Sequence, residues 1–192
     1  LDGLNIINQT KIIAVSKTFK MDKILPLIKH GHVDYGENKV QEAVEKWTSI
    51  KHDFPKIKLH LLGKLQTNKV KFVIPLFDYI HSLDSIKLAS KISEQQIKKN
   101  FKPKVFIQIN IGAEDQKGGI HEENLNNFYK QCVEEFKLDI IGLMSIPPFD
   151  KDPKPYFIKM KELSNNLNLK EISMGMSNDY LEAIKQGSTF IR

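Results

Sequence analysis

Eight short apolar segments with the character of strands alternate along the chain with segments of helical periodicity. Strands that alternate with helices in this way pair in parallel, because each helix carries the chain back to the same end of the sheet. Eight is also the number of strands that closes a (β/α)8 barrel. The expected strands span residues 11–17, 33–38, 58–63, 78–84, 104–111, 139–146, 171–176 and 188–192.

A doubly wound open sheet is the alternative arrangement of the same segments. It lacks the support of a G-x-G-x-x-G turn, which the sequence does not contain. The chain stops at its eighth strand after 192 residues, and a barrel usually needs about 200 residues or more. We expect an α/β fold of the (β/α)8 TIM barrel type with trimmed N- and C-terminal ends, in which residues 1–192 form a single domain.

Three residues give local signals about the expected helices. Pro26 weakens the helix expected around residues 24–28 unless it lies in the first turn. Thr67 is expected to cap a helix that carries apolar residues through 70–77. Gly187 follows the last helical segment and is expected to end it as a C′ glycine.

The formal net charge of +6 raises the question of a nucleic-acid partner. The 29 basic residues comprise 28 lysines and one arginine, Arg192, and the lysines are scattered among acidic residues. Because arginine is the usual reader of guanine, these side chains are poorly suited to base recognition. We therefore expect no nucleic-acid partner, whereas small anionic ligands remain compatible with the charge.

The apolar segments are too short for a membrane. Every apolar run is interrupted well before the roughly 18 residues of a membrane-spanning helix, and residues 1–8 lack the features of a signal peptide. The single cysteine, Cys132, cannot form an internal disulfide and is expected to pack within a helix. We expect a cytoplasmic protein with no membrane partner.

In a barrel, functional side chains gather at the carboxyl ends of the strands. Lys17, at the end of the first expected strand, is the one lysine in that set. Burial favours the neutral amine of a lysine, and a neutral amine attacks aldehydes, so Lys17 is a candidate for a Schiff base. The alternative is a lysine that extends beyond its strand into solvent. Position alone does not favour the first reading.

The segment S-M-G-M-S-N-D, residues 173–179, leads from a strand into a short helix through glycine and serine. Free backbone N–H groups and the Ser177 hydroxyl at such a helix start are suited to phosphate. Arg192 ends the last strand and would stand close by in a closed barrel, and arginine holds phosphate through paired hydrogen bonds. These residues predict a phosphate site after the seventh and eighth strands.

The remaining polar residues carry weaker signals. The six histidines lack H-x-x-x-H or H-E-x-x-H spacing, so no metal site is expected. His60 and His81 fall inside strands and are expected as core or lining residues. Glu37 and Asp84 lie at strand ends and could act as acid and base, but nothing in the sequence pairs them. We therefore name no catalytic residue and no metal ligand.

An aldehyde-accepting lysine and a phosphate site at one barrel mouth match the two ends of pyridoxal 5′-phosphate (PLP). Seven motifs resemble, in order, those of the pyridoxal phosphate homeostasis protein family, also called proline synthetase co-transcribed homologues. The motifs are A-V-S-K-T, D-Y-G-E-N-K-V-Q-E, H-L-L-G-K-L-Q-T-N-K, H-S-L-D, I-Q-I-N-I, G-L-M-S-I and S-M-G-M-S-N-D-Y-L-E-A-I-K-Q-G-S-T-F-I-R.

The resemblance implies a single-domain barrel of fold type III, related to the N-terminal domain of alanine racemase. It implies that Lys17 carries PLP as a Schiff base, that Ser177 and Arg192 lie around the phosphate, and that Asn38 lies near the ring. The family is thought to buffer and deliver PLP without turnover of a substrate. Three family features are missing or short here: the helix before the first strand, the phosphate-binding I-G-x-x-x-F-G segment after the last strand, and the loop after Pro148.

A protein that binds PLP in this way could belong to either of two functional classes. The first is a carrier that holds PLP and passes it to apo forms of PLP enzymes, and we expect such a carrier to be a monomer. The second is an enzyme similar to an amino-acid racemase, which would need a second base, typically a tyrosine, on the opposite face of the ring. None of the five tyrosines falls at an expected strand end, so we favour the carrier.

Overall fold

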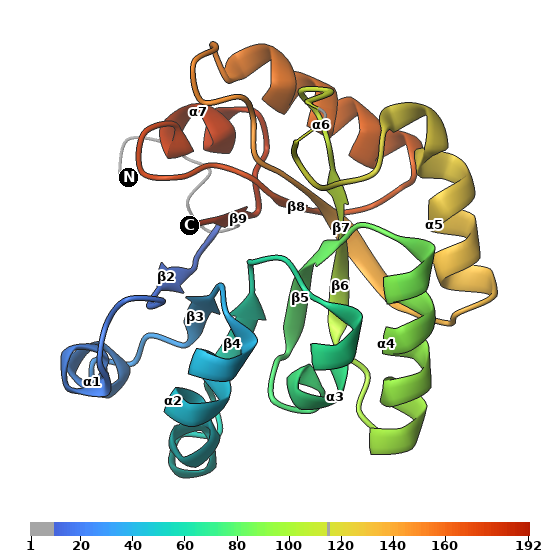
Figure 1. Cartoon of the computed structure of the whole chain (residues 1–192). Coiled ribbons are helices and arrows are strands. Elements are labelled where there is room, and N and C mark those ends of the chain that lie inside the picture. Colours follow the sequence, from blue (N-terminus) through green and yellow to red (C-terminus); the bar gives the residue numbers. More distant parts are fainter. Residues whose placement is uncertain (1–9, 115) are drawn as a thin grey trace.

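The computed structural model describes residues 10–114 and 116–192, so the expectation for residues 1–8 lies outside the described residues. Within this part of the chain, nine parallel strands form a nearly closed barrel with helices around it, as Figure 1 shows, and the predicted barrel class is confirmed. The strands are β1 (Lys11–Ile12), β2 (Ala14–Val15), β3 (Asp34–Glu37), β4 (Lys58–Leu61), β5 (Tyr79–Leu83), β6 (Lys104–Ile109), β7 (Asp139–Ser145), β8 (Glu171–Ser173) and β9 (Phe190–Ile191).

The first strand differs from its prediction, because the segment 11–17 contains two short strands that pair with different neighbours. β1 pairs in parallel with β9, the last strand, and β2 pairs in parallel with β3. The N–H of Ile13, between the two, donates to the carbonyl of Ile191 over 2.8 Å. The two halves of one segment therefore join the two edges of the sheet, which explains nine strands where eight were predicted.

The helices lie on the outside of the barrel in Figure 1 and connect successive strands. Among the described residues, no helix combines the length and the apolar character needed to cross a membrane. The helices are α1 (Met21–Lys29), α2 (Val40–Asp53), η2 (Thr67–Lys69), α3 (Val70–Val73), α4 (Ile86–Lys99), η3 (Glu122–Asn124), α5 (Leu125–Glu134), α6 (Lys154–Asn166) and α7 (Tyr180–Lys185).

Two of the three local helix signals need correction. Pro26 lies inside α1 rather than in its first turn. The carbonyl that loses its donor there belongs to the exposed Asp22, so water can replace the missing hydrogen bond. Thr67 is the first residue of η2 and caps nothing, since the Lys69 N–H donates to the Gln66 carbonyl in a tight 3₁₀ turn. Gly187 has φ of +90° directly after α7, which confirms the predicted C′ glycine.

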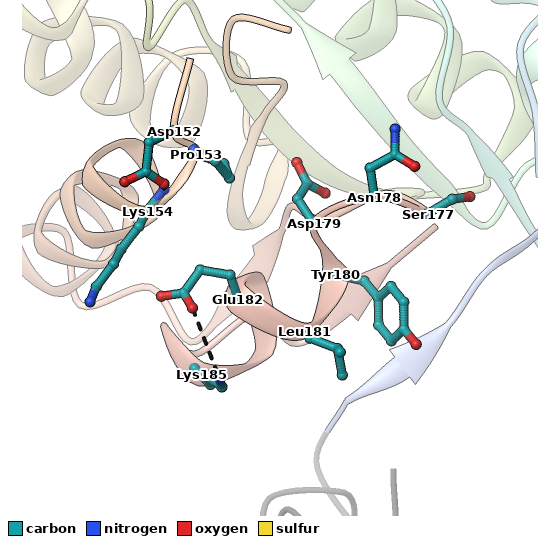
Figure 2. Close-up of a pocket in the computed structure, with 10 residues that line it drawn as sticks. All are labelled: Asp152, Pro153, Lys154, Ser177, Asn178, Asp179, Tyr180, Leu181, Glu182 and Lys185. Carbon is teal, nitrogen blue, oxygen red and sulfur yellow. Dashed lines mark hydrogen bonds and ion pairs between the residues drawn. The ribbon is translucent and has the colours of Figure 1, made fainter. Parts of the chain in front are cut away.

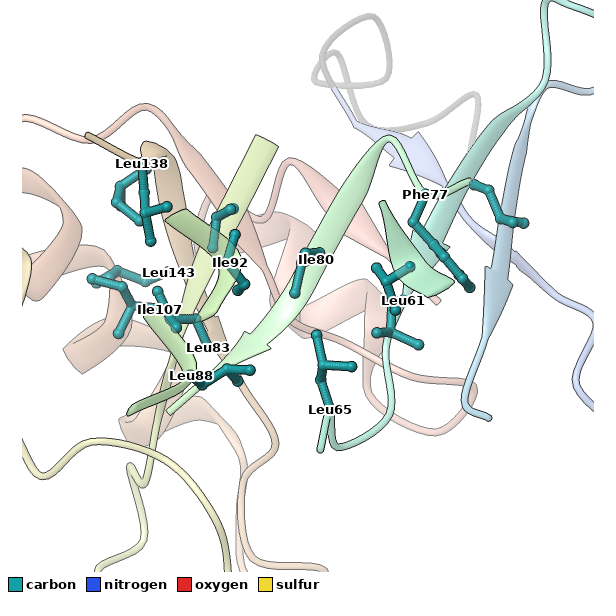
Figure 3. Packing of buried hydrophobic residues seen from close by; sticks show 14 of the residues in the cluster. Leu61, Leu65, Phe77, Ile80, Leu83, Leu88, Ile92, Ile107, Leu138 and Leu143 are labelled. Carbon is teal, nitrogen blue, oxygen red and sulfur yellow. The ribbon is translucent and has the colours of Figure 1, made fainter. Parts of the chain in front are cut away.

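The main core lies between the barrel and its helices. Side chains alternate along β4, so Leu59 and Leu61 point outward and His60 points inward. Figure 3 shows Ile80 and Leu83 of β5 among the outward residues that pack together with helix residues such as Leu88 and Ile92. Cys132 is fully buried on α5 in this cluster, as the sequence predicted.

The inward side chains form a second, smaller cluster inside the barrel. It consists of six apolar and aromatic residues that lie in the strands or next to their ends. These side chains fill the interior, as is typical of (β/α)8 barrels. Its members are Ile13, Leu62, Tyr79, Phe106, Met144 and Phe190.

The turn after β4 depends on Gly63. A Cβ atom at this position would lie 2.1 Å from the carbonyl oxygen of Asn38, which is backbone and cannot move aside cheaply. Gly63→Ala should therefore lower the free energy of unfolding by about 2 kcal/mol, as measured by urea denaturation. Gly118→Ala is the control, because the nearest atom to its Cβ would lie 3.3 Å away, on the side chain of Asp84. Equal unfolding midpoints for the two variants would contradict this account.

Candidate functional site

All four residues that the sequence singled out line one cavity of about 350 Å³. Lys17 follows β2, Asn38 follows β3, Ser177 follows β8 and Arg192 follows β9. The cavity therefore lies at the carboxyl ends of these parallel strands, where barrels place their functional sites. Its walls combine these polar groups with apolar residues. The full lining is Val15, Lys17, Thr18, Phe19, Asn38, Leu62, Ile146, Met176, Ser177 and Arg192.

Lys17 differs in one respect from the expectation at the end of a buried strand. Its side chain is exposed, as are those of Thr18 and Phe19 beside it. The strand before it ends at Val15, and the N–H of Ser16 donates to the Gly36 carbonyl over 2.9 Å. Strand pairing therefore stops just before Lys17, and its side chain is not buried as the sequence suggested.

A buried carboxylate fixes the strand ends that carry Lys17 and Asn38. Glu37 is fully buried. Its Oε1 atom accepts hydrogen bonds from Ser16 Oγ at 2.8 Å, Lys46 Nζ at 2.9 Å and Trp47 Nε1 at 2.9 Å. Lys46 Nζ also donates to the Ser16 carbonyl over 2.8 Å. Because Ser16 and Glu37 directly precede the two cavity residues, this cluster ties α2 to both.

Arg192 occupies an interior position at the mouth. Its Nη2 donates to the carbonyl of Ser145 over 3.1 Å, and its Nη1 donates to the hydroxyl of Ser173 over 3.2 Å. Burial lowers the pKa of Arg192 to about 10, while the nearby carboxylate of Asp179 opposes this shift. The guanidinium stays charged at neutral pH. Two of its five N–H groups are used in these bonds, which leaves three for a ligand in the cavity.

The turn that carries Ser177 is held by its own residues. The Met176 N–H donates to Asp179 Oδ1 over 2.6 Å, and the N–H groups of Asp179 and Tyr180 donate to the Met176 carbonyl. Gly175 has φ of +96°, and a Cβ there would lie 2.6 Å from that of Ala183. Ser177 itself is exposed. The Ser177 hydroxyl is therefore accessible to a ligand. The Met176 N–H, one of the amides predicted to bind phosphate, is instead bonded to the Asp179 carboxylate.

Ser177 also borders a second hollow, around the start of α7. Figure 2 shows this hollow with Asp152, Asp179 and Glu182 among its lining residues, and Glu182 forms an ion pair with Lys185 over 3.9 Å. The three carboxylates outnumber the two lysines of this hollow, Lys154 and Lys185, so its charge does not favour an anionic ligand. The phosphate prediction is therefore better placed on the cavity side of Ser177, toward Arg192.

The sequence did not reveal the hydrogen bonds that hold the residues behind the cavity. Glu37 was noted at a strand end, but its partners Lys46 and Trp47 lie in the next helix, and no spacing rule joins them to it. Ser173 was read only as part of the turn, whereas its hydroxyl holds Arg192. The sequence did place Glu37 and Ser173 in or next to expected strands, which was its one indication of their position.

The family model described as alanine racemase, N-terminal domain, matches residues 4–192 of this chain. The pyridoxal phosphate homeostasis protein of Aquifex aeolicus is 38% identical over 194 residues, covering 96% of this chain and 84% of that protein. The protein of the same name from Mus musculus is 36% identical over 207 residues, covering 96% and 74%. The chain belongs to the pyridoxal phosphate homeostasis protein family, as the motifs indicated.

Solved structures agree with this assignment. PipY of Synechococcus elongatus PCC7942, in its structure without PLP, is 32% identical and has a TM-score of 0.91 over 96% of this chain and 90% of PipY. The structure of PipY with PLP bound has a TM-score of 0.87 at the same identity. Alanine racemase of Clostridium difficile, 16% identical with a TM-score of 0.75 over 98% of this chain and 52% of the racemase, shares the fold.

The Glu37 cluster leads to a prediction about stability. Glu37→Gln removes the charge that compensates the nearly buried Lys46 amine, so the free energy of unfolding should fall by about 3 kcal/mol. Glu42→Gln is the matched control, because Glu42 pairs with Lys39 on the surface and such pairs contribute little. Urea denaturation of both variants measures the difference. An unchanged midpoint for Glu37→Gln would show that the cluster does not hold the strand ends.

Proposed function

We propose that this chain binds PLP reversibly in the cavity at the barrel mouth and keeps it available for delivery, without turning over a substrate. The observation that carries the proposal is the gathering of an amine, an amide, a hydroxyl and a partly buried guanidinium around one cavity of about 350 Å³, within the size range of small-ligand sites. The names of the relatives and the PLP-bound PipY structure support it.

The four polar groups match the groups of PLP in kind. PLP supplies an aldehyde, and the Lys17 amine would join the aldehyde carbon as an imine with loss of one water molecule. The Ser177 hydroxyl would donate a hydrogen bond to the phosphate. Arg192 would supply positive charge from the interior side with its remaining N–H groups. Asn38 would contact the ring. These roles remain predictions.

The composition of the cavity favours a carrier over a racemase. A racemase needs a second acid or base facing the ring from the side opposite the lysine. Among the described residues that line the cavity there is no Tyr, His, Asp or Glu, and Lys17 and Arg192 are the only ionisable groups. These lining residues would therefore offer a bound amino acid no partner for a second proton transfer, and a racemase would have to take that partner from another domain or subunit. Storage of PLP requires no second acid or base.

Delivery requires that an acceptor can approach the mouth. Phe19, Ile146 and Met176 line the cavity and are all exposed to solvent, with Phe19 at 55%. Such an apolar rim suits contact with another protein. We propose apo forms of PLP enzymes as the acceptors and a monomer as the carrier.

Absorbance titration tests the proposal. Wild-type protein mixed with micromolar PLP should develop the absorbance band of a lysine adduct and saturate at one PLP per chain. Lys17→Ala should abolish this band, whereas Lys20→Ala should leave it intact, since Lys20 is exposed and does not line the cavity. Arg192→Lys should weaken PLP binding about tenfold, because lysine cannot reproduce the paired hydrogen bonds of arginine. A band that persists in Lys17→Ala would contradict the proposal.

A further inference from the structure

A line of hydrogen bonds runs through the barrel interior from the mouth to the opposite end. Arg192 Nη1 lies 3.2 Å from Ser173 Oγ, which lies 2.9 Å from His81 Nδ1. His81 Nε2 lies 3.0 Å from His60 Nδ1, and His60 Nε2 lies 2.9 Å from Asp34 Oδ1. The five residues come from β3, β4, β5, β8 and the end of β9. We refer to these five residues as the interior relay.

The chemistry of the two ends sets the direction of every bond in the interior relay. The Arg192 guanidinium can only donate, so the Ser173 oxygen accepts its bond. At the other end the Asp34 carboxylate accepts, so His60 carries its proton on Nε2. In a neutral ring the Nδ1 of His60 is then bare and accepts from the Nε2–H of His81. The Nδ1 of a neutral His81 is bare in turn and accepts from the Ser173 hydroxyl. With both rings neutral, one arrangement of protons satisfies all four contacts.

The interior relay is sealed from solvent along its middle. His60, His81 and Ser173 are fully buried. The His60 ring stacks on Tyr79 with ring centres 4.2 Å apart, and the His81 ring stacks on Phe106 at 4.3 Å. Burial lowers the pKa of both histidines, that of His81 further because His60 and Arg192 adjoin it. Both rings are therefore neutral at neutral pH, as the directed arrangement requires.

The two ends of the interior relay differ in access and carry opposite charges. Arg192 lines the cavity at the mouth. Asp34 begins β3 at the amino end of the barrel, and 14% of its side chain is exposed. A buried set of polar groups stabilises a fold little by comparison with apolar residues that fill the same space. What such a set provides is a fixed orientation for the group at its end.

We propose that the interior relay orients Arg192 for its ligand in the cavity, with Ser173 and His81 as positioning residues that never touch that ligand. The inference rests on the proposed function, in which the ligand is PLP. Among the described residues, removal of the Ser173 hydroxyl leaves the Ser145 carbonyl as the one hydrogen-bond partner of the guanidinium. The guanidinium then has more freedom to rotate. A ligand with an anionic group must order the guanidinium when it binds, and the cost of this ordering lowers the affinity.

Ser173→Ala tests the inference with a minimal change, and Ser164→Ala is its control. Ser164 is equally buried, and its hydroxyl donates to the Leu169 carbonyl far from the cavity. We expect Ser173→Ala to bind PLP about tenfold more weakly, which corresponds to one hydrogen bond to a charged group, and to shift the absorbance maximum of bound PLP. Ser164→Ala should change neither. Unfolding midpoints measured alongside account for any general loss of stability.

A second variant pair tests the next bond in the interior relay. His81→Phe removes the acceptor for Ser173, whereas the side-chain oxygen of His81→Asn can occupy the place of Nδ1. We expect His81→Phe to weaken PLP binding and His81→Asn to restore it in part. In an Arg192→Lys background the Ser173→Ala effect should largely disappear, because the two residues then no longer act on each other.

The outcomes separate the inference from the proposed function. Wild-type protein that binds no PLP would overturn both. Wild-type binding, with an unchanged Kd and spectrum in Ser173→Ala, would overturn the interior relay and leave the proposed function standing. The losses of binding free energy in Ser173→Ala and Arg192→Lys could also prove fully additive in the double variant. This result would overturn the interior relay as well, since a purely structural role of Ser173 gives additive effects.

Discussion

Closure of the barrel through its first segment is the constraint on which the site depends. Residues 11–15 pair with β9 through their first half and with β3 through their second. The beginning and the end of the chain thereby become neighbours in the sheet. Lys17 and Arg192 are 175 positions apart in sequence, yet they line the same cavity because the strands before them share this junction. Without closure, the amine and the guanidinium would stand at opposite edges of an open sheet.

The polar groups behind the cavity are fixed by partners rather than by packing alone. Glu37 collects three donors on one oxygen and so joins β2, β3 and α2. Its other oxygen, Oε2, is buried without a hydrogen-bond partner among the described residues. Arg192 is anchored on the carbonyl of Ser145 and the hydroxyl of Ser173. The mouth is thus a rigid frame around an exposed lysine, an arrangement suited to holding a ligand that must later leave.

Much of the barrel and the composition of the cavity could be predicted from the sequence. The alternation of segments is a local property, and parallel strands direct all their carboxyl ends to one mouth, so Lys17, Asn38, Ser177 and Arg192 follow from strand positions. The split of the first strand could not be predicted, because a seven-residue segment with four apolar residues at its centre does not indicate which neighbour each half will meet. The exposure of Lys17 was missed for a second reason, because the sequence does not show that strand pairing ends at Ser16, one residue before it.

The interior contacts were beyond sequence reasoning for a different physical reason. His60 and His81 are 21 positions apart, and His81 and Ser173 are 92 apart. Contact between them depends on the register of neighbouring strands and on the inward direction of each side chain, which no local pattern encodes. The sequence could only identify the histidines as core or lining residues, and the structure bears out that reading.

The central claim is that Lys17 holds PLP at the barrel mouth. Borohydride reduction of the PLP-loaded wild-type chain, followed by peptide mass mapping, tests it most directly, because reduction makes the bond between lysine and ligand permanent. The account predicts one reduced pyridoxal phosphate group per chain, located on the peptide that contains Lys17. Labelling spread over several lysines, or confined to a lysine outside the cavity, would contradict it.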